Sequence, residues 1–264
     1  MFKYLLKFLL IVTVSNTILY ADKLVEIKKK GILKVGVKYD VKPFGFLNEN
    51  GEVVGFDIDL AKYIADDLDV ALSLVEVSSK SRIPLLLKKE IDLIAASMTH
   101  TMKRDEDIDF TDSYFLDYQA LLVRSYAKEK KLKDFSGKSI GVMHGSTSAK
   151  AIEEKNPEAK VVYFQESIQA LLALKRGKIA AISTDFAWCT TKVIDSKGVL
   201  KVLNEQISIQ PYGMGVNENQ SNYRDAINLS LQKAKKDGTY DDIYLKWFGE
   251  YPQKIKMALP IVRP

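Results

Sequence analysis

Short apolar runs alternate with amphipathic stretches along the chain from Ile32 onward. Between residues 55 and 69 the apolar positions return every three or four residues, at Ile58, Leu60, Ala61, Ile64, Ala65 and Leu68. This spacing, with acidic residues at its start, predicts an amphipathic helix. β-branched runs predict strands at 33–37, 72–77 and 91–95, with another helix at 79–88. The alternation is typical of an α/β fold with largely parallel sheets.

The second half of the chain repeats this pattern. Strands are predicted at 139–142, 161–164 and 180–183, and helices are predicted to open at Ser146 and Ser167. The repetition favours two separate lobes.

Two extended runs, at 115–123 and 210–215, are predicted to link the lobes. The chain would cross at the first run, build the second lobe, and return as a helix at 221–235 and a closing segment at 240–248. We therefore expect two lobes with two hinge crossings, an arrangement that supports closure around a ligand. The expected division is 22–116 with 211–264 for lobe I, and 117–210 for lobe II.

The N-terminus has the three-part layout of a secretory signal peptide, which we assign to residues 1–21. Lys3 and Lys7 precede an apolar stretch at 8–14, and a short polar segment ends at Ala21. The alternative is an uncleaved membrane anchor, but Ser15 and its neighbours interrupt the apolar run well short of about 20 residues. With no cysteine there to receive a lipid, the expected product is periplasmic and not lipidated.

Charge and cysteine content exclude several classes of protein. The 264 residues contain 39 Lys and Arg against 34 Asp and Glu, and the resulting charge of +5 is spread along the chain. Such a weak, dispersed charge predicts neither nucleic-acid binding nor a polybasic membrane patch. Cys189 is the only cysteine, so the sequence offers no disulfide framework and no multi-cysteine metal cluster. No phosphate-binding glycine loop or other cofactor motif is present, and we expect no cofactor.

Many short motifs, in order, resemble the solute-binding proteins of polar amino acid ABC importers, the bacterial extracellular solute-binding protein family 3. The resemblance covers about residues 24–249 and rests on segments 33–37, 43–46, 55–61, 81–84, 91–94, 109–111, 145–147, 184–185, 237–240 and 246–249. It implies the two-lobed type II periplasmic-binding-protein fold, an α/β clamshell with a mixed, mostly parallel sheet in each lobe. It also implies a monomer that captures an amino acid and delivers it to the transmembrane permease subunits of an ABC importer.

The resemblance implies a clamp for the ligand's α-carboxylate on lobe I. Arg104 would donate two N–H groups to that carboxylate, a geometry that lysine does not offer. Thr99 would add its backbone N–H and hydroxyl, Ser97 its carbonyl, and Met98 lies between them. Without the family match, Arg104 in its charged run would be assigned to a surface salt bridge.

The resemblance places the rest of the clamp on lobe II. Gly145, Ser146 and Thr147 begin a predicted helix, so their free N–H groups would face the same carboxylate. Asp185 would pair with the ligand's α-ammonium group and hold the lobes shut. The competing interpretation is that Ser146, Thr147 and Asp185 only cap helices.

Side-chain selection is predicted from Lys38 and Arg82, which resemble the two cations of aspartate- and glutamate-binding members. Three inward cations against Asp185 match a ligand with two carboxylates and one ammonium, whereas a basic ligand would meet like charge. We therefore expect aspartate or glutamate. Glutamine, cystine and other polar amino acids remain alternatives, since an arginine at the position of Arg82 also occurs in family members of broader specificity.

Two other functions deserve comparison. Cyclohexadienyl dehydratases share the fold, but no His or Glu is placed in the pocket by the sequence, so we expect a binding protein and not an enzyme. A sensory role would require presentation of the closed form to a receptor, because neither a second membrane span nor a signalling domain is evident.

Overall fold

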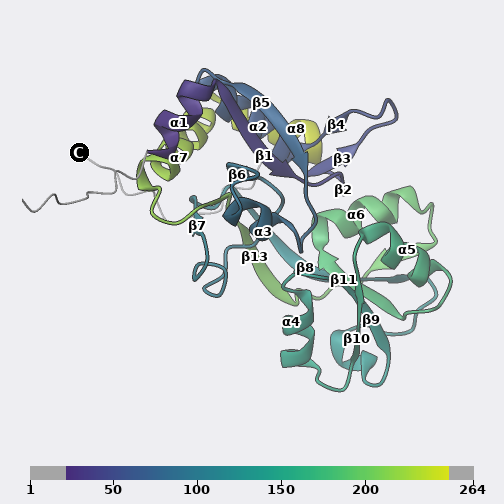
Figure 1. The fold of residues 1–264 in the computed structure, drawn as a ribbon. Coiled ribbons are helices and arrows are strands. Elements are labelled where there is room, and N and C mark those ends of the chain that lie inside the picture. The colour runs from purple at the N-terminus through teal and green to yellow at the C-terminus, as the bar shows by residue number, and fades with distance from the viewer. Residues whose placement is uncertain (1–21, 250–264) are drawn as a thin grey trace, which may run out of the picture.

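A computed structural model describes residues 22–249, which form two α/β lobes side by side (Figure 1). The expected signal peptide at 1–21 and the tail at 250–264 lie outside the described residues. Among residues 22–249, no helix is long and apolar enough to cross a membrane.

The first lobe is built on a sheet with the strand order β5-β1-β6-β14-β7. Its strands are β1 (Ile32–Val37), β5 (Ala71–Glu76), β6 (Leu93–Ile94), β7 (Asp109–Phe110) and β14 (Gly215–Val216). A small antiparallel sheet at the side of the lobe contains β2 (Asp40–Val41), β3 (Gly45–Leu47) and β4 (Val53–Val54). The strand β14 comes from the far end of the chain, so this lobe is assembled from two separate segments.

Helices from both ends of the chain pack on this lobe. They are α1 (Lys23–Lys30), α2 (Phe56–Asp67), α3 (Arg82–Leu87), α7 (Ser221–Asp237) and α8 (Thr239–Phe248). The helix α7 contacts both α1 and α2, and α8 contacts α2 and α7. The helix α1 was not predicted. It begins where the Asp22 carboxylate accepts a hydrogen bond from the Leu24 N–H and ends at Gly31, which has a φ of 68°.

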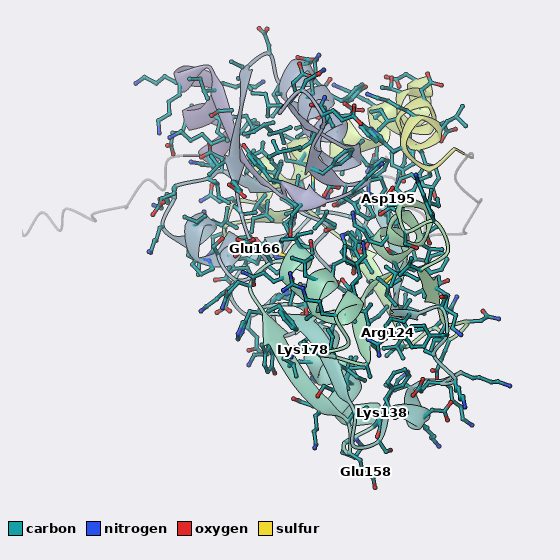
Figure 2. The ribbon with its side chains drawn as sticks, turned by 90° about the vertical axis from the view of Figure 1, so that its right-hand side faces the viewer. Arg124, Lys138, Glu158, Glu166, Lys178 and Asp195 are labelled. Carbon is teal, nitrogen blue, oxygen red and sulfur yellow. The ribbon has the colours of Figure 1, made fainter. Side chains whose placement is uncertain are left out.

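The second lobe is built on a six-stranded sheet with the order β10-β9-β11-β8-β12, and a sixth strand, β13, also pairs with β8. Its strands are β8 (Phe115–Arg124), β9 (Ser139–Met143), β10 (Lys160–Phe164), β11 (Ala181–Asp185), β12 (Leu200–Val202) and β13 (Ser208–Tyr212). Its helices are α4 (Ser148–Lys155), α5 (Ser167–Lys175), α6 (Phe186–Asp195) and the short 3₁₀-helix η1 (Leu132–Phe135). Figure 2 shows Lys138 and Glu158 at the end of this lobe that is farthest from the first.

Both sheets are mixed, and the expectation of mostly parallel strands holds for only one side of each. The pairs β5-β1, β1-β6, β10-β9 and β9-β11 are parallel. The strand β14 is antiparallel to β6 and β7, and β8 is antiparallel to all three of its neighbours. The reason is that β8 and β14 belong to chain that passes from one lobe to the other, without the crossover helix that joins neighbouring parallel strands.

The two crossings are β8 and β13, which lie against each other in antiparallel register from Phe115–Tyr212 to Gln119–Ser208. Both were predicted as extended segments. The proposed lobe boundaries at 116/117 and 210/211 fall inside these strands and remain predictions. An aromatic cluster anchors the first-lobe end of the crossing, where the Phe115 ring lies 5.0 Å from Phe44 and 5.7 Å from Tyr212, measured between centroids.

Candidate functional site

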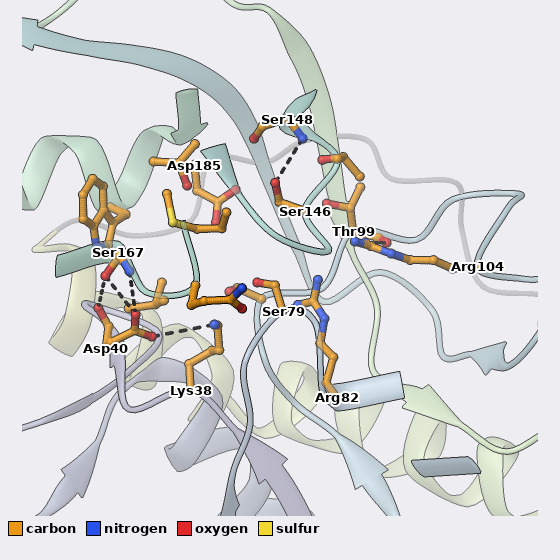
Figure 3. A pocket seen from close by; sticks show the side chains of 17 residues that line it. Lys38, Asp40, Ser79, Arg82, Thr99, Arg104, Ser146, Ser148, Ser167 and Asp185 are labelled. Atoms are coloured by element: carbon orange, nitrogen blue, oxygen red, sulfur yellow. Dashed lines mark hydrogen bonds and ion pairs between the residues drawn. The ribbon is translucent and has the colours of Figure 1, made fainter. Parts of the chain in front are cut away.

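A cavity of about 40 Å³, counted as the space that the centre of a water molecule can occupy, lies between the two lobes (Figure 3). One water molecule needs roughly 10–15 Å³ on this measure, so the cavity has room for a few water molecules. The predicted residues that border it are Lys38, Arg82, Ser97, Thr99, Arg104, Ser146, Thr147 and Asp185. Met98, the ninth, does not border it. Its side chain is fully buried in a core cluster, and its carbonyl accepts a hydrogen bond from the Gly213 N–H.

Arg104 joins the lobes across one end of the cavity. Its Nη1 donates to the Thr99 carbonyl at 2.6 Å, and its Nη2 donates to the Gly145 carbonyl of the second lobe at 2.8 Å. In the described part of the chain it forms no salt bridge, so the surface ion-pair interpretation is wrong. Burial lowers the pKa of Arg104 to about 10, and Asp185 partly offsets this shift. The guanidinium is therefore charged at neutral pH.

The turn at Ser97 is fixed by a buried carboxylate that was not predicted. The Ser97 backbone has a φ of 42°, and its N–H donates to Asp57 Oδ2 at 2.8 Å. The Tyr114 hydroxyl donates to the other oxygen of Asp57, also at 2.8 Å. Desolvation raises the pKa of Asp57 to about 7, against the stabilising effect of these two hydrogen bonds.

Gln210 connects the crossing strand β13 to both lobes. Its Oε1 accepts a hydrogen bond from the Thr99 hydroxyl and another, at 2.8 Å, from the Thr147 hydroxyl. Thr147 therefore does not use its side chain to cap α4. Gln210 could not be recognised from its sequence neighbours, because its partners lie 111 and 63 residues away.

The loop before α4 differs from the prediction. The helix begins at Ser148 and not at Ser146, and the Ser146 N–H donates to the Met143 carbonyl at 3.1 Å. The expectation that this N–H is free to face a ligand is therefore wrong. Ser146 borders the cavity and accepts a weak hydrogen bond from the Ser148 N–H at 3.3 Å (Figure 3).

Asp185 ends β11 and directly precedes α6, but its side chain makes no capping hydrogen bond. Burial raises the pKa of its carboxyl group, while a hydrogen bond with Tyr212 and the charges of Arg82, Lys38 and Arg104 act in the opposite direction. Figure 3 shows Asp185 on the side of the cavity opposite Lys38 and Arg82. Trp188, one turn further along α6, was expected in the core; it is buried and also borders the cavity.

At the opposite end of the cavity Lys38 lies beside Asp40, with 3.7 Å between Nζ and Oδ1. Only 6% of the surface of Lys38 is exposed, and this burial lowers its pKa, against the opposing effect of Asp40. The other oxygen of Asp40 accepts hydrogen bonds from the Ser167 hydroxyl at 2.9 Å and from the Ser167 N–H at 3.2 Å. Asp40 therefore links the end of the cavity beside Lys38 to Ser167, the first residue of α5.

Arg82 approaches from the first lobe and is 3% exposed. Its Nη1 donates to the Ala96 carbonyl at 2.7 Å, and its Nε is buried without a hydrogen-bond partner among the described residues. Burial and the nearby Arg104 lower the pKa of Arg82 to about 9, and Asp185 opposes this shift. Arg82 thus stays charged at neutral pH.

The charge around the cavity differs from the predicted count because Asp40 was missed. Lys38, Arg82 and Arg104 face two bordering carboxylates, Asp40 and Asp185, and not one. With two carboxylates present, the charges around the cavity suit a ligand with an uncharged side chain better than the predicted count did.

Sequence comparison agrees with this architecture. Residues 33–250 match the bacterial extracellular solute-binding proteins, family 3. The chain belongs to this family. A relative of this family 3 protein is the ABC transporter glutamine-binding protein GlnH of Bacillus subtilis (strain 168), which is 40% identical over 236 residues, covering 88% of this chain and 86% of GlnH.

Other relatives of this family 3 protein carry similar names. The glutamine-binding protein of Geobacillus stearothermophilus is 42% identical over 209 residues, covering 76% of this chain and 79% of that protein. Among solved structures, an ancestral arginine-binding protein bound to glutamine superimposes with a TM-score of 0.80 at 40% identity, covering 83% of this chain and 99% of that one. The two-lobed type II fold expected from the sequence is thus confirmed, and these relatives are named as binding proteins.

The expected likeness to aspartate- and glutamate-binding members is corrected by the same comparisons. The relatives are named for glutamine or arginine, and neither name points to an acidic amino acid. Asp40 borders the cavity beside Lys38, where a second ligand carboxylate had been expected.

Proposed function

We propose that the protein captures glutamine between its lobes in the periplasm and delivers it to an ABC importer. The observation that carries this proposal is the Lys38–Asp40 pair at the end of the cavity away from Arg104. Relatives named as glutamine-binding proteins support it.

The pair at this end offers both a donor and an acceptor. A carboxamide needs an acceptor for its NH₂ group and a donor for its carbonyl oxygen. In the proposal, Asp40 accepts from the amide NH₂, and Lys38 donates to the amide oxygen. A glutamate side chain lacks the N–H donor and would place a carboxylate beside that of Asp40, which disfavours it.

The other end of the ligand is proposed to be held as the family resemblance implies. Arg104 would bind the α-carboxylate by redirecting its two N–H donors from the Thr99 and Gly145 carbonyls or by sharing them. Asp185 would receive the α-ammonium group from the second lobe. Because these two residues lie on different lobes, a bound zwitterion stabilises the closed form over the open one.

Arginine is the second candidate, because Asp40 and Asp185 could face a cation and one of the similar structures is named for arginine. The buried ammonium of Lys38 argues against it, since a guanidinium at this end would meet a like charge. We further propose that residues 1–21 are removed on export, that the mature protein acts as a monomer, and that it is a carrier and not a dehydratase.

Isothermal titration calorimetry of the protein, unfolded and refolded to remove carried ligand, tests the proposal with glutamine, arginine, glutamate and aspartate. Glutamine is expected to bind most tightly. Asp40→Asn should reduce the preference for glutamine over glutamate by about tenfold or more, because repulsion of roughly 1–3 kcal/mol is removed. The exposed Asp112, which does not border the cavity, provides the control Asp112→Asn. Tightest binding of arginine, glutamate or aspartate, or no binding of any of the four, contradicts the proposal.

A further inference from the structure

A second carboxylate lies behind Asp185, and neither the family match nor the cavity lining accounts for it. Asp117 is on β8, whose register places Gln119 opposite Asp185 on the neighbouring strand β11. It is 5% exposed and does not border the cavity. Asp117 therefore has no direct route to a ligand, and its effect must pass through Asp185.

Three hydrogen-bond donors fix the position of the Asp117 carboxylate. Its Oδ1 accepts from the Tyr118 N–H at 2.7 Å, and its Oδ2 accepts from the Ala187 N–H in the first turn of α6 at 3.2 Å. The Tyr212 hydroxyl also donates to Oδ2, at 3.3 Å, and the same hydroxyl acts on the pKa of Asp185, but its single proton can serve only one of the two carboxylates at a time. One tyrosine thus lies between two buried carboxyl groups.

Among residues 22–249, no basic nitrogen lies within 4.0 Å of the Asp117 or the Asp185 carboxylate, so neither forms an ion pair. Two buried carboxylates on either side of one hydroxyl repel each other if both are charged, and the single hydroxyl proton can satisfy only one of them. The least costly state of the empty site is one in which the pair keeps a proton.

We propose that Asp117 is a positioning residue that keeps one proton on the Asp117–Asp185 pair in the ligand-free protein, and that the ligand's α-ammonium group displaces this proton. The inference rests on the proposed function, because it requires an amino group at Asp185. No bond other than O–H is broken. The proton passes from the pair to the solvent buffer as the ammonium group replaces it as the positive charge beside Asp185.

The groups around the pair support this assignment. On the second lobe they are Tyr118, Cys189 and Tyr212, and burial raises the pKa of each of the last two well above its usual value, so both are neutral near pH 7. Burial and the neighbouring Asp185 raise the pKa of Asp117 to about 7.

The cations of the first lobe act on Asp185 and not on Asp117. Arg82, Lys38 and Arg104 lower the pKa of Asp185, which makes Asp117 the member of the pair that holds the proton. Since the proton is bound in the empty protein and absent in the complex, low pH favours the empty protein. Ligand affinity should therefore rise with pH up to about 7, by up to about tenfold per unit, and level off above it.

Calorimetry in two buffers with different ionisation enthalpies, such as phosphate and Tris, measures the protons released on glutamine binding. We expect about one proton per ligand at pH 6, about half at pH 7 and almost none at pH 8. Asp117→Asn removes the second charge and keeps a carbonyl acceptor for one of the two N–H donors, so its proton release and its pH dependence between 6 and 8 should both nearly vanish.

Asp92→Asn is the control, because Asp92 is also a buried carboxylate, but it pairs with Lys23 at 2.6 Å in the first lobe and does not border the cavity. Its proton release should remain like that of the wild type. Binding with the same enthalpy in both buffers overturns the inference, as does release that persists in Asp117→Asn or disappears in Asp92→Asn. Absence of any binding heat contradicts the proposed function instead, so the two failures are distinguishable.

Discussion

At the scale of single residues, Arg104 is notable because its two donors contact carbonyls on different lobes. The Thr99 and Gly145 carbonyls hold the guanidinium in place. A positioned arginine loses little side-chain entropy when it binds a carboxylate. The α-carboxylate of any amino acid would meet this preformed donor.

Arg104→Ala is therefore expected to weaken binding of every amino acid ligand, by at least about 30-fold, since loss of one partner of a buried charge pair costs about 2–5 kcal/mol. Arg104→Lys should recover only part of the loss, because lysine lacks the second N–H direction. Arg224→Ala, which removes an arginine paired with Asp109 at 3.8 Å on the surface, is the control. Calorimetry that gives less than a threefold effect for Arg104→Ala contradicts this role.

The sequence indicated some of the cavity residues, and the reason differs from residue to residue. Arg104 and Asp185 lie within motifs that resemble a known family, so their positions beside one cavity could be predicted. Asp40 and Asp117 could not, because each depends on pairing with distant residues: Asp40 with Ser167, and Asp117 with Tyr212. The ligand-binding roles of all these residues remain predictions.

At the scale of elements, the start of α5 is held against the first lobe by Asp40. The Ser167 hydroxyl and N–H both donate to this carboxylate, and the free N–H groups at a helix start favour a negative charge. The second lobe therefore contacts the same carboxylate that we propose contacts the ligand's side chain.

Ser167→Ala removes the hydroxyl donor and leaves the backbone donor in place. Glutamine affinity should fall by about 5- to 30-fold, corresponding to about 1–2 kcal/mol for one hydrogen bond to a charged group. Ser221, the exposed first residue of α7, provides Ser221→Ala as a control on a helix start away from the cavity. Equal affinities for the two variants would show that the contact does not stabilise the closed form.

The elements themselves were predicted to different degrees. The helix α2 was found because its apolar positions repeat over three turns, and β8 because it is long and apolar. The helix α1 has a single buried residue, Ile27, so its pattern is too weak to find. The start of α4 was placed two residues early because Ser146 resembles a helix cap but lies in a turn.

At the scale of the whole molecule, Gly145 of the second lobe lies against the backbone of the first. A Cβ atom at Gly145 would lie 2.5 Å from the Ser79 carbonyl oxygen, which is too close for a stable contact. Its φ of 77° also favours glycine. Gly137 has a similar φ of 73°, but a Cβ atom there meets no other atom within 4 Å.

Gly145→Ala and Gly137→Ala therefore separate backbone strain from hindered closure. Each should lower the free energy of unfolding by about 1–2 kcal/mol in urea titrations without ligand, because both place alanine at a positive φ. Only Gly145→Ala should also weaken glutamine binding, by about tenfold or more, since the closed form must shift to admit the methyl group. The same affinity in both variants would contradict a tight contact at this point.

The position of β14 between β6 and β7 has a consequence for the order in which the protein becomes structured during synthesis. A ribosome makes the chain from its N-terminus, so every residue of the second lobe has been synthesised before Gly215 and Val216 are added. The first lobe lacks an internal strand until then, and also lacks α7 and α8, which pack on α2. The first lobe to be started is thus the last to be finished, and a nascent chain passes through a stage in which its earliest apolar residues have no final partners.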